Sequence, residues 1–148
     1  MEYLKLKDEY ILKLQADEEI IDTIKQFAIA KKIKSGFLWG IGTAKEITLG
    51  YYDVKEKLYK KRLFIEDHEI SSLIGNISYI GTDPIIHIHI VISPENFVSY
   101  SGHLFSAKVS ATCEIMIKTY SKKIMRIPEN QIGLNLLHLR PTRYQKPK

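Results

Sequence analysis

The sequence predicts an α/β domain of the α+β kind, in which one main helix packs on a largely antiparallel β-sheet of about seven or eight strands. Two observations predict this fold class. Most of the chain consists of short segments in which apolar and polar residues alternate, separated by residues that favour turns. A single segment, residues 17–33, instead repeats its apolar residues with the spacing of a helix.

Length and composition fit one globular domain. The chain has 148 residues, of which 45% are hydrophobic and 26% are charged. We expect residues 1–139 to form a single domain and the basic residues 140–148 to be a disordered tail. No apolar run approaches the ~20 residues that span a bilayer, and the first residues lack the pattern of a signal peptide. We therefore expect a cytoplasmic protein with no membrane contact, in which the lone Cys113 forms no disulfide within the chain.

The positive charge of the chain has two explanations. The formal net charge is +5 and the sequence pI is about 9.2, which permits binding to DNA or another polyanion. Lysine and isoleucine are both abundant, and the coding bias of an AT-rich genome would produce the same excess. Charge alone therefore does not decide between them.

The helical segment follows a first predicted strand at residues 10–14. Asp17 is placed to accept hydrogen bonds from the first turn, and the acidic residues after it favour the positive helix end. The stripe that we expect against the sheet consists of Ile20, Ile21, Ile24, Phe27 and Ala28.

Glycines interrupt the apolar segment that follows, at Gly36, Gly40 and Gly42. They do not predict a dinucleotide-binding loop, because Lys45 occupies the third glycine position and the next residues are strand-like. Glycines within a strand more often mark a bulge or a close approach of two backbones.

Further strands complete the predicted sheet. Residues 46–52 and 58–65 flank a polar turn and predict a β-hairpin. Its basic second arm either protects a sheet edge, the interpretation that we favour, or contacts nucleic acid. The remaining segments are a bulged strand at 69–80, a turn at 81–84, a strand at 84–92, a loop or short hairpin arm at 93–102, a strand at 107–117, a turn at 128–130 and a final strand at 133–139.

Three of the five histidines lie in and shortly after the strand at 84–92. Alternation along this strand buries its isoleucines and points His87 and His89 to the other face, roughly 6.6 Å apart. A returning hairpin would bring His103 to the same face. Three histidines and a water form an open zinc site. Half-buried histidines that only hydrogen-bond to a neighbouring strand are the alternative.

Two carboxylates are candidates for the surroundings of such a metal. Glu69 and Glu114 could orient an imidazole, or act as acid/base groups beside a metal-activated water; a position in solvent or at a subunit contact is the simpler interpretation of Glu114. We expect His68 and His138 to be structural. A cupin site is disfavoured, because Glu95 lies one residue beyond the cupin carboxylate position and would face the wrong way.

Several short motifs follow one another in a characteristic order. They are Ser35-Gly36, Gly40-Ile41-Gly42, Leu49-Gly50-Tyr51-Tyr52-Asp53, residues 69–77, His87-Ile88-His89, Gly102-His103-Leu104, Glu114 and Gly133-Leu134-Asn135-Leu136-Leu137. In this order they resemble the plant-and-prokaryote conserved domain, abbreviated PPC or PCC, in its stand-alone prokaryotic form. The resemblance extends from about Tyr10 to Leu139.

The resemblance implies a homotrimer in which His87, His89 and His103 form a metal cluster for zinc or another divalent transition metal. It also implies a DNA-binding or regulatory protein, because plant members carry this domain beside AT-hooks. This chain lacks the Arg-Gly-Arg-Pro core of an AT-hook, so DNA contacts would come from lysines spread over the trimer. A metal-dependent enzyme of the hydrolase or lyase type, and a sensor of a small-molecule ligand near the metal, stay open as alternatives.

Overall fold

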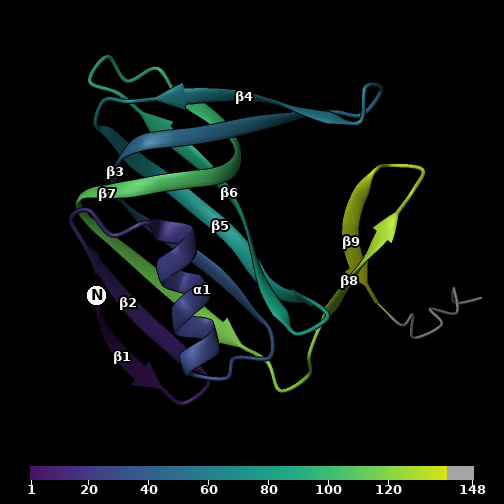
Figure 1. The fold of residues 1–148 in the computed structure, drawn as a ribbon. Coiled ribbons are helices and arrows are strands. Elements are labelled where there is room, and N and C mark those ends of the chain that lie inside the picture. Colours follow the sequence, from purple (N-terminus) through teal and green to yellow (C-terminus); the bar gives the residue numbers. More distant parts are fainter. Residues whose placement is uncertain (140–148) are drawn as a thin grey trace, which may run out of the picture.

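The computed structural model describes residues 1–139, and the tail predicted at 140–148 lies outside the described residues. The elements are, in chain order, β1 (Glu2–Leu6), β2 (Glu9–Gln15), α1 (Ile20–Ala30), β3 (Gly36–Asp53), β4 (Leu58–Phe64), β5 (His68–Ile80), β6 (Asp83–Ser93), β7 (Tyr100–Thr119), β8 (Met125–Glu129) and β9 (Leu134–His138). Figure 1 shows the predicted combination of one helix and a large sheet. The predicted fold class is confirmed.

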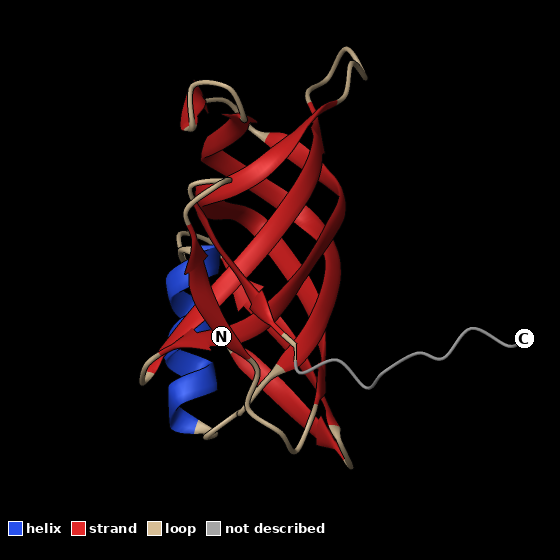
Figure 2. Cartoon of the chain, turned by 90° about the vertical axis from the view of Figure 1, so that its right-hand side faces the viewer, coloured by secondary structure: helices blue, strands red, loops and turns tan. Residues whose placement is uncertain are grey.

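All these strands belong to one sheet, with the order β1-β2-β7-β3-β5-β8-β9. Outside this order, β4 pairs with β3, and β6 pairs with both β5 and β7. Because β3 and β6 each pair with both β5 and β7, these four long strands close into a ring of antiparallel neighbours (Figure 2). Within residues 1–139, the only parallel pairing joins Tyr79 of β5 to Met125 of β8. The ring fixes the positions of β6 and β7, the two strands that carry the candidate ligands.

One apolar core holds the sheet and the helix together. Buried side chains of β2, β3, β5, β6 and β7 pack with α1, which contacts β6 and β7 (Figure 1). The buried residues of α1 are Ile20, Ile24, Phe27 and Ala28, and Ile21 is partly buried against them. The predicted stripe therefore faces the core. Within residues 1–139, no helix has the length and apolar character needed to cross a membrane.

The helix begins later than the sequence predicts. Glu19, rather than Asp17, caps it, because the Glu19 carboxylate accepts a hydrogen bond from the backbone N–H of Asp22 at 2.6 Å. Asp17 has a φ of +67°, and its N–H donates to the carbonyl oxygen of Val109 at 2.9 Å. This bond ties the backbone before the helix to β7, so that the helical turn forms only after it.

Two other segments differ from the sequence prediction. The alternating pattern does not identify β1, because all five of its residues are exposed and no buried face stands out. Pro128, predicted in a turn, lies within β8 opposite Asn135 of β9. At this point β8 has a partner strand on one side only, where the missing N–H of a proline is tolerated. The turn follows at residues 130–133.

The predicted strand irregularities are present. The register of β3 against β5 shifts between Gly40 and Gly42, and that of β5 against β6 shifts between Ile70 and Ser72. Gly42 has a φ of +154°, and a Cβ at this position would collide with the carbonyl oxygen of Thr112. β3 and β4 form the predicted hairpin.

Candidate metal centre

β6 turns its isoleucines into the core and its histidines away from it. Ile88, Ile90 and Ile92 are 0%, 1% and 0% exposed. His87 and His89 lie on the opposite face, where His87 is half-buried and His89 is exposed. The predicted alternation is therefore present, and it places two imidazoles side by side on one strand.

β7 brings His103 to the same place. β7 runs antiparallel to β6, and the register sets His103 directly opposite His89. The ring centroids lie 5.2 Å apart for His87 and His89, 5.0 Å for His87 and His103, and 5.6 Å for His89 and His103. One ring nitrogen from each residue lies within 4.8 Å of the other two. The three side chains thus gather at one spot.

The protonation state of two of these histidines, His87 and His103, suits a metal. Burial, more than any neighbouring charge, lowers the pKa of His87 to about 4 and the pKa of His103 to about 4. Both imidazoles are therefore uncharged at neutral pH, as metal ligation requires. In the described part of the chain, Nδ1 of His103 is buried and has no hydrogen-bond partner. An unused buried nitrogen among neutral imidazoles fits a divalent transition metal.

Aromatic side chains cover one side of the cluster. The ring of His103 lies against Tyr59 of β4 and Phe105 of β7, with centroid distances of 5.2 and 4.8 Å. Nζ of Lys61 lies 3.8 Å from the centroid of the Phe105 ring. These rings keep water from His103, which is the physical basis of its low pKa.

β8 adds a cation that no motif in the sequence indicates. Nη2 of Arg126 lies 3.0 Å from Nδ1 of His87. Figure 1 shows the β8–β9 hairpin beside the main body of the sheet. Two contacts hold it there: β8 pairs with β5, and at the tip of the hairpin the carbonyl oxygen of Ile132 accepts a hydrogen bond from Tyr52 Oη at 2.6 Å. No spacing in the sequence signals this approach, because it depends on contacts between distant residues.

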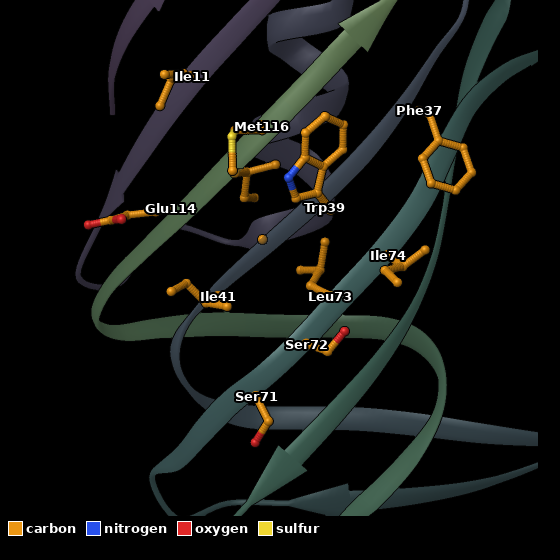
Figure 3. Close-up of a pocket in the computed structure, with 12 residues that line it drawn as sticks. Ile11, Phe37, Trp39, Ile41, Ser71, Ser72, Leu73, Ile74, Glu114 and Met116 are labelled. Atoms are coloured by element: carbon orange, nitrogen blue, oxygen red, sulfur yellow. The ribbon is translucent and has the colours of Figure 1, made fainter.

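The two candidate carboxylates are not brought to the histidines. Within residues 1–139, the group of possible metal ligands contains the three histidines alone. Glu69 lines a cavity together with His68, and Glu114 lines a separate apolar cavity (Figure 3). Their role beside the metal stays a prediction. His68 is buried and bonded through Nδ1 to the carbonyl oxygen of Glu66 at 2.8 Å, as a structural histidine would be.

The apolar cavity lies over β3, β5 and β7 and measures about 690 Å³. Trp39, Ile41, Ile74 and Met116 line it and are 37%, 58%, 50% and 42% exposed. Figure 3 shows these side chains over neighbouring strands around the cavity. A contiguous exposed apolar surface of this kind marks an interaction site more often than a free surface.

Comparison with known proteins identifies the family. The model of the Plants and Prokaryotes Conserved (PCC) domain matches residues 1–121. The chain belongs to the PCC family. This confirms the resemblance that the motifs suggest. No curated protein matches the chain.

Solved structures agree with PCC membership over almost the whole chain. A "putative DNA-binding protein" from Bacteroides thetaiotaomicron is 34% identical, with a TM-score of 0.90 over 93% of this chain and 96% of that one. A plant- and prokaryote-conserved protein from Pyrococcus horikoshii is 30% identical, with a TM-score of 0.84 over 95% and 96%. A metal-containing protein from Archaeoglobus fulgidus is 31% identical, with a TM-score of 0.84 over 93% and 97%. The PCC fold is therefore the fold of this chain.

Proposed function

We propose that this PCC protein binds a divalent transition metal, zinc in the first instance, through His87, His89 and His103. The proposal depends on one observation, the convergence of three ring nitrogens within 4.8 Å of one another. The low pKa values of His87 and His103 and the metal-containing relative from Archaeoglobus fulgidus support it. Three histidines leave one coordination position of zinc open.

The surroundings favour binding over catalysis. A zinc ion held by three neutral histidines would lower the pKa of a bound water to about 7. A hydrolase or lyase would also need a group that moves protons, and within residues 1–139 no carboxylate joins the histidine group. A metal-dependent enzyme and a metal-dependent sensor of a small ligand therefore stay alternatives to simple metal binding.

Metal content of protein purified without a nickel column tests the proposal. We expect about one zinc ion per chain in the unmodified protein, and loss of zinc in His89→Asn, a variant of an exposed residue that the fold tolerates. His138→Asn is the matched control, because His138 is an exposed histidine in β9. Zinc well below one ion per chain, after incubation with zinc and dialysis, would rule out the proposed site.

We further propose that the apolar cavity surface is covered by other copies of the chain in a homotrimer. An isolated molecule would leave Trp39, Ile41, Ile74 and Met116 in water. Light scattering should give a mass three times the 17.1 kDa of one chain. Ile41→Lys should lower that mass, whereas Leu63→Lys, at an equally exposed position outside the cavity lining, should not. A monomeric mass for the unmodified protein would refute the assembly.

DNA binding in the cytoplasm, in a regulatory role, is the second candidate function. It is supported by the name of the Bacteroides relative and by the net charge of +5. Electrostatic contacts to phosphates make DNA affinity fall steeply with salt. Gel shifts at rising salt concentration should show this fall if the lysines of the assembly contact DNA. Absence of any shift at low salt would exclude DNA binding.

A further inference from the structure

Arg126 is the one charged side chain hydrogen-bonded to the histidine cluster within residues 1–139. Its guanidinium is held by four polar groups. Nε donates to Ser78 Oγ at 2.7 Å, Nη1 to the carbonyl oxygen of Asn135 at 2.8 Å, and Nη2 to Asn76 Oδ1 at 3.1 Å and His87 Nδ1 at 3.0 Å. No carboxylate is among these partners, so a partly buried positive charge has only neutral acceptors around it.

The contact with His87 is incompatible with a metal on the same ring. Arginine only donates hydrogen bonds, so His87 Nδ1 must accept with its lone pair. A neutral imidazole has one such lone pair. A metal on Nδ1 would take that lone pair from Arg126. A metal on Nε2 would require a proton on Nδ1, which would then face the N–H of the guanidinium. Arg126 must therefore leave His87 when the metal binds, whichever nitrogen is the ligand.

Charge indicates where Arg126 turns next. The loaded centre would combine a divalent cation with the guanidinium, and the described residues contribute no acidic ligand. Ser78, Asn135 and Asn76 would still accept from Nε, Nη1 and one N–H of Nη2. The second N–H of Nη2, which His87 accepts in the contact above, would be free beside the metal. A planar guanidinium next to an open coordination position matches a carboxylate, which offers one oxygen to the metal and one to the arginine.

We propose that Arg126 exchanges partners: it holds His87 when the centre is empty and pairs with a small carboxylate anion bound to the metal when the centre is loaded. This inference rests on the proposed metal site and makes the centre a place for a metal and a carboxylate ligand together. Removal of Arg126 then has two opposite effects, since the metal loses a competitor and the anion loses a partner.

Cobalt and acetate are the probes for this test, because the visible spectrum of Co²⁺ reports both its binding and a change of its ligands. In Arg126→Met we expect cobalt to bind about tenfold more tightly than in the unmodified protein, and acetate to bind the cobalt-loaded protein about tenfold more weakly, the effect of one charge-assisted hydrogen bond. Arg62→Met is the control. Arg62 packs on Phe64 and Tyr100, away from the cluster, and both affinities should stay unchanged.

The opposite signs separate the proposal from simple damage to the fold. A misplaced β8–β9 hairpin would weaken both affinities, and that result would overturn the proposal, as would no change in either. Arg126→Lys provides a second variant that keeps the charge but not the planar fork; its acetate affinity should lie between those of the unmodified protein and Arg126→Met. Equal cobalt binding in all variants would support the metal site and contradict the role proposed for Arg126. No cobalt binding in any variant would contradict both the metal site and the role of Arg126.

Discussion

Replacement of His103 by phenylalanine should stabilise the metal-free protein. Nδ1 of His103 is buried without a partner, and a group of this kind costs about 1–3 kcal/mol. A phenyl ring would keep the contacts with Tyr59 and Phe105, which lie 5.2 and 4.8 Å from the imidazole centroid. Part of the gain is offset because the phenyl ring is larger. We expect a net gain of about 1 kcal/mol, or about 2–4 °C in melting temperature.

The same variant should be the less stable one when zinc is present. Zinc at 100 times its Kd would add about 2.7 kcal/mol to the unmodified protein and nothing to His103→Phe. Thermal unfolding at one fixed protein concentration, with EDTA and with zinc, measures both differences, and His138→Phe serves as the exposed control. A His103→Phe protein that melts at a lower temperature than the unmodified protein in EDTA would show that Nδ1 of His103 has a hydrogen-bond partner in the metal-free protein, contrary to this prediction.

Three further predictions concern stability. Burial lowers the pKa of His87 and His103 from 6.5 to about 4, so between these pH values the unfolded chain binds protons that the folded chain does not. The metal-free protein should therefore lose stability as the pH falls from 6.5 to 4. Unfolding in EDTA across this range measures the effect, and a stability that does not change with pH would show that the two rings are solvated. Ile88→Ala should cost about 2–5 kcal/mol in urea denaturation, since Ile88 is fully buried. Gly42→Ala should cost more stability than Gly81→Ala, because an added Cβ would meet backbone atoms at Gly42 and nothing within 4 Å at Gly81; equal urea midpoints would contradict this.

The ligand strand was predictable because its pattern is local. Alternation in a strand sets the face of each side chain without any knowledge of the rest of the fold, so the buried isoleucines and the outward His87 and His89 follow from their order. The position of His103 depends in addition on the return of the chain as an antiparallel neighbour of β6. A return of this kind was expected, because the loop between the two strands has an ordinary length. The family motifs agree with this arrangement.

The features that the sequence did not predict depend on distant contacts. The helix start moves from Asp17 to Glu19 because β7 binds the backbone before it, and β7 lies far along the chain. Arg126 reaches His87 only because the β8–β9 hairpin docks beside β5. A lone arginine in a short strand carries no pattern, so neither its burial nor its partner is visible until the tertiary structure is known.

The histidines on β6 and Arg126 on β8 are held in place with unequal strength, and this difference decides which of them moves when a ligand binds. β6, which carries His87 and His89, is paired along its whole length with β5 and at its end with β7, so a shift of these histidines would break many backbone hydrogen bonds. β8 meets β5 at a single residue pair. Moving Nη2 of Arg126 disturbs only side-chain bonds to Asn76 and His87. The histidines therefore form the fixed part of the centre, and a competition between metal and guanidinium is settled by movement of Arg126.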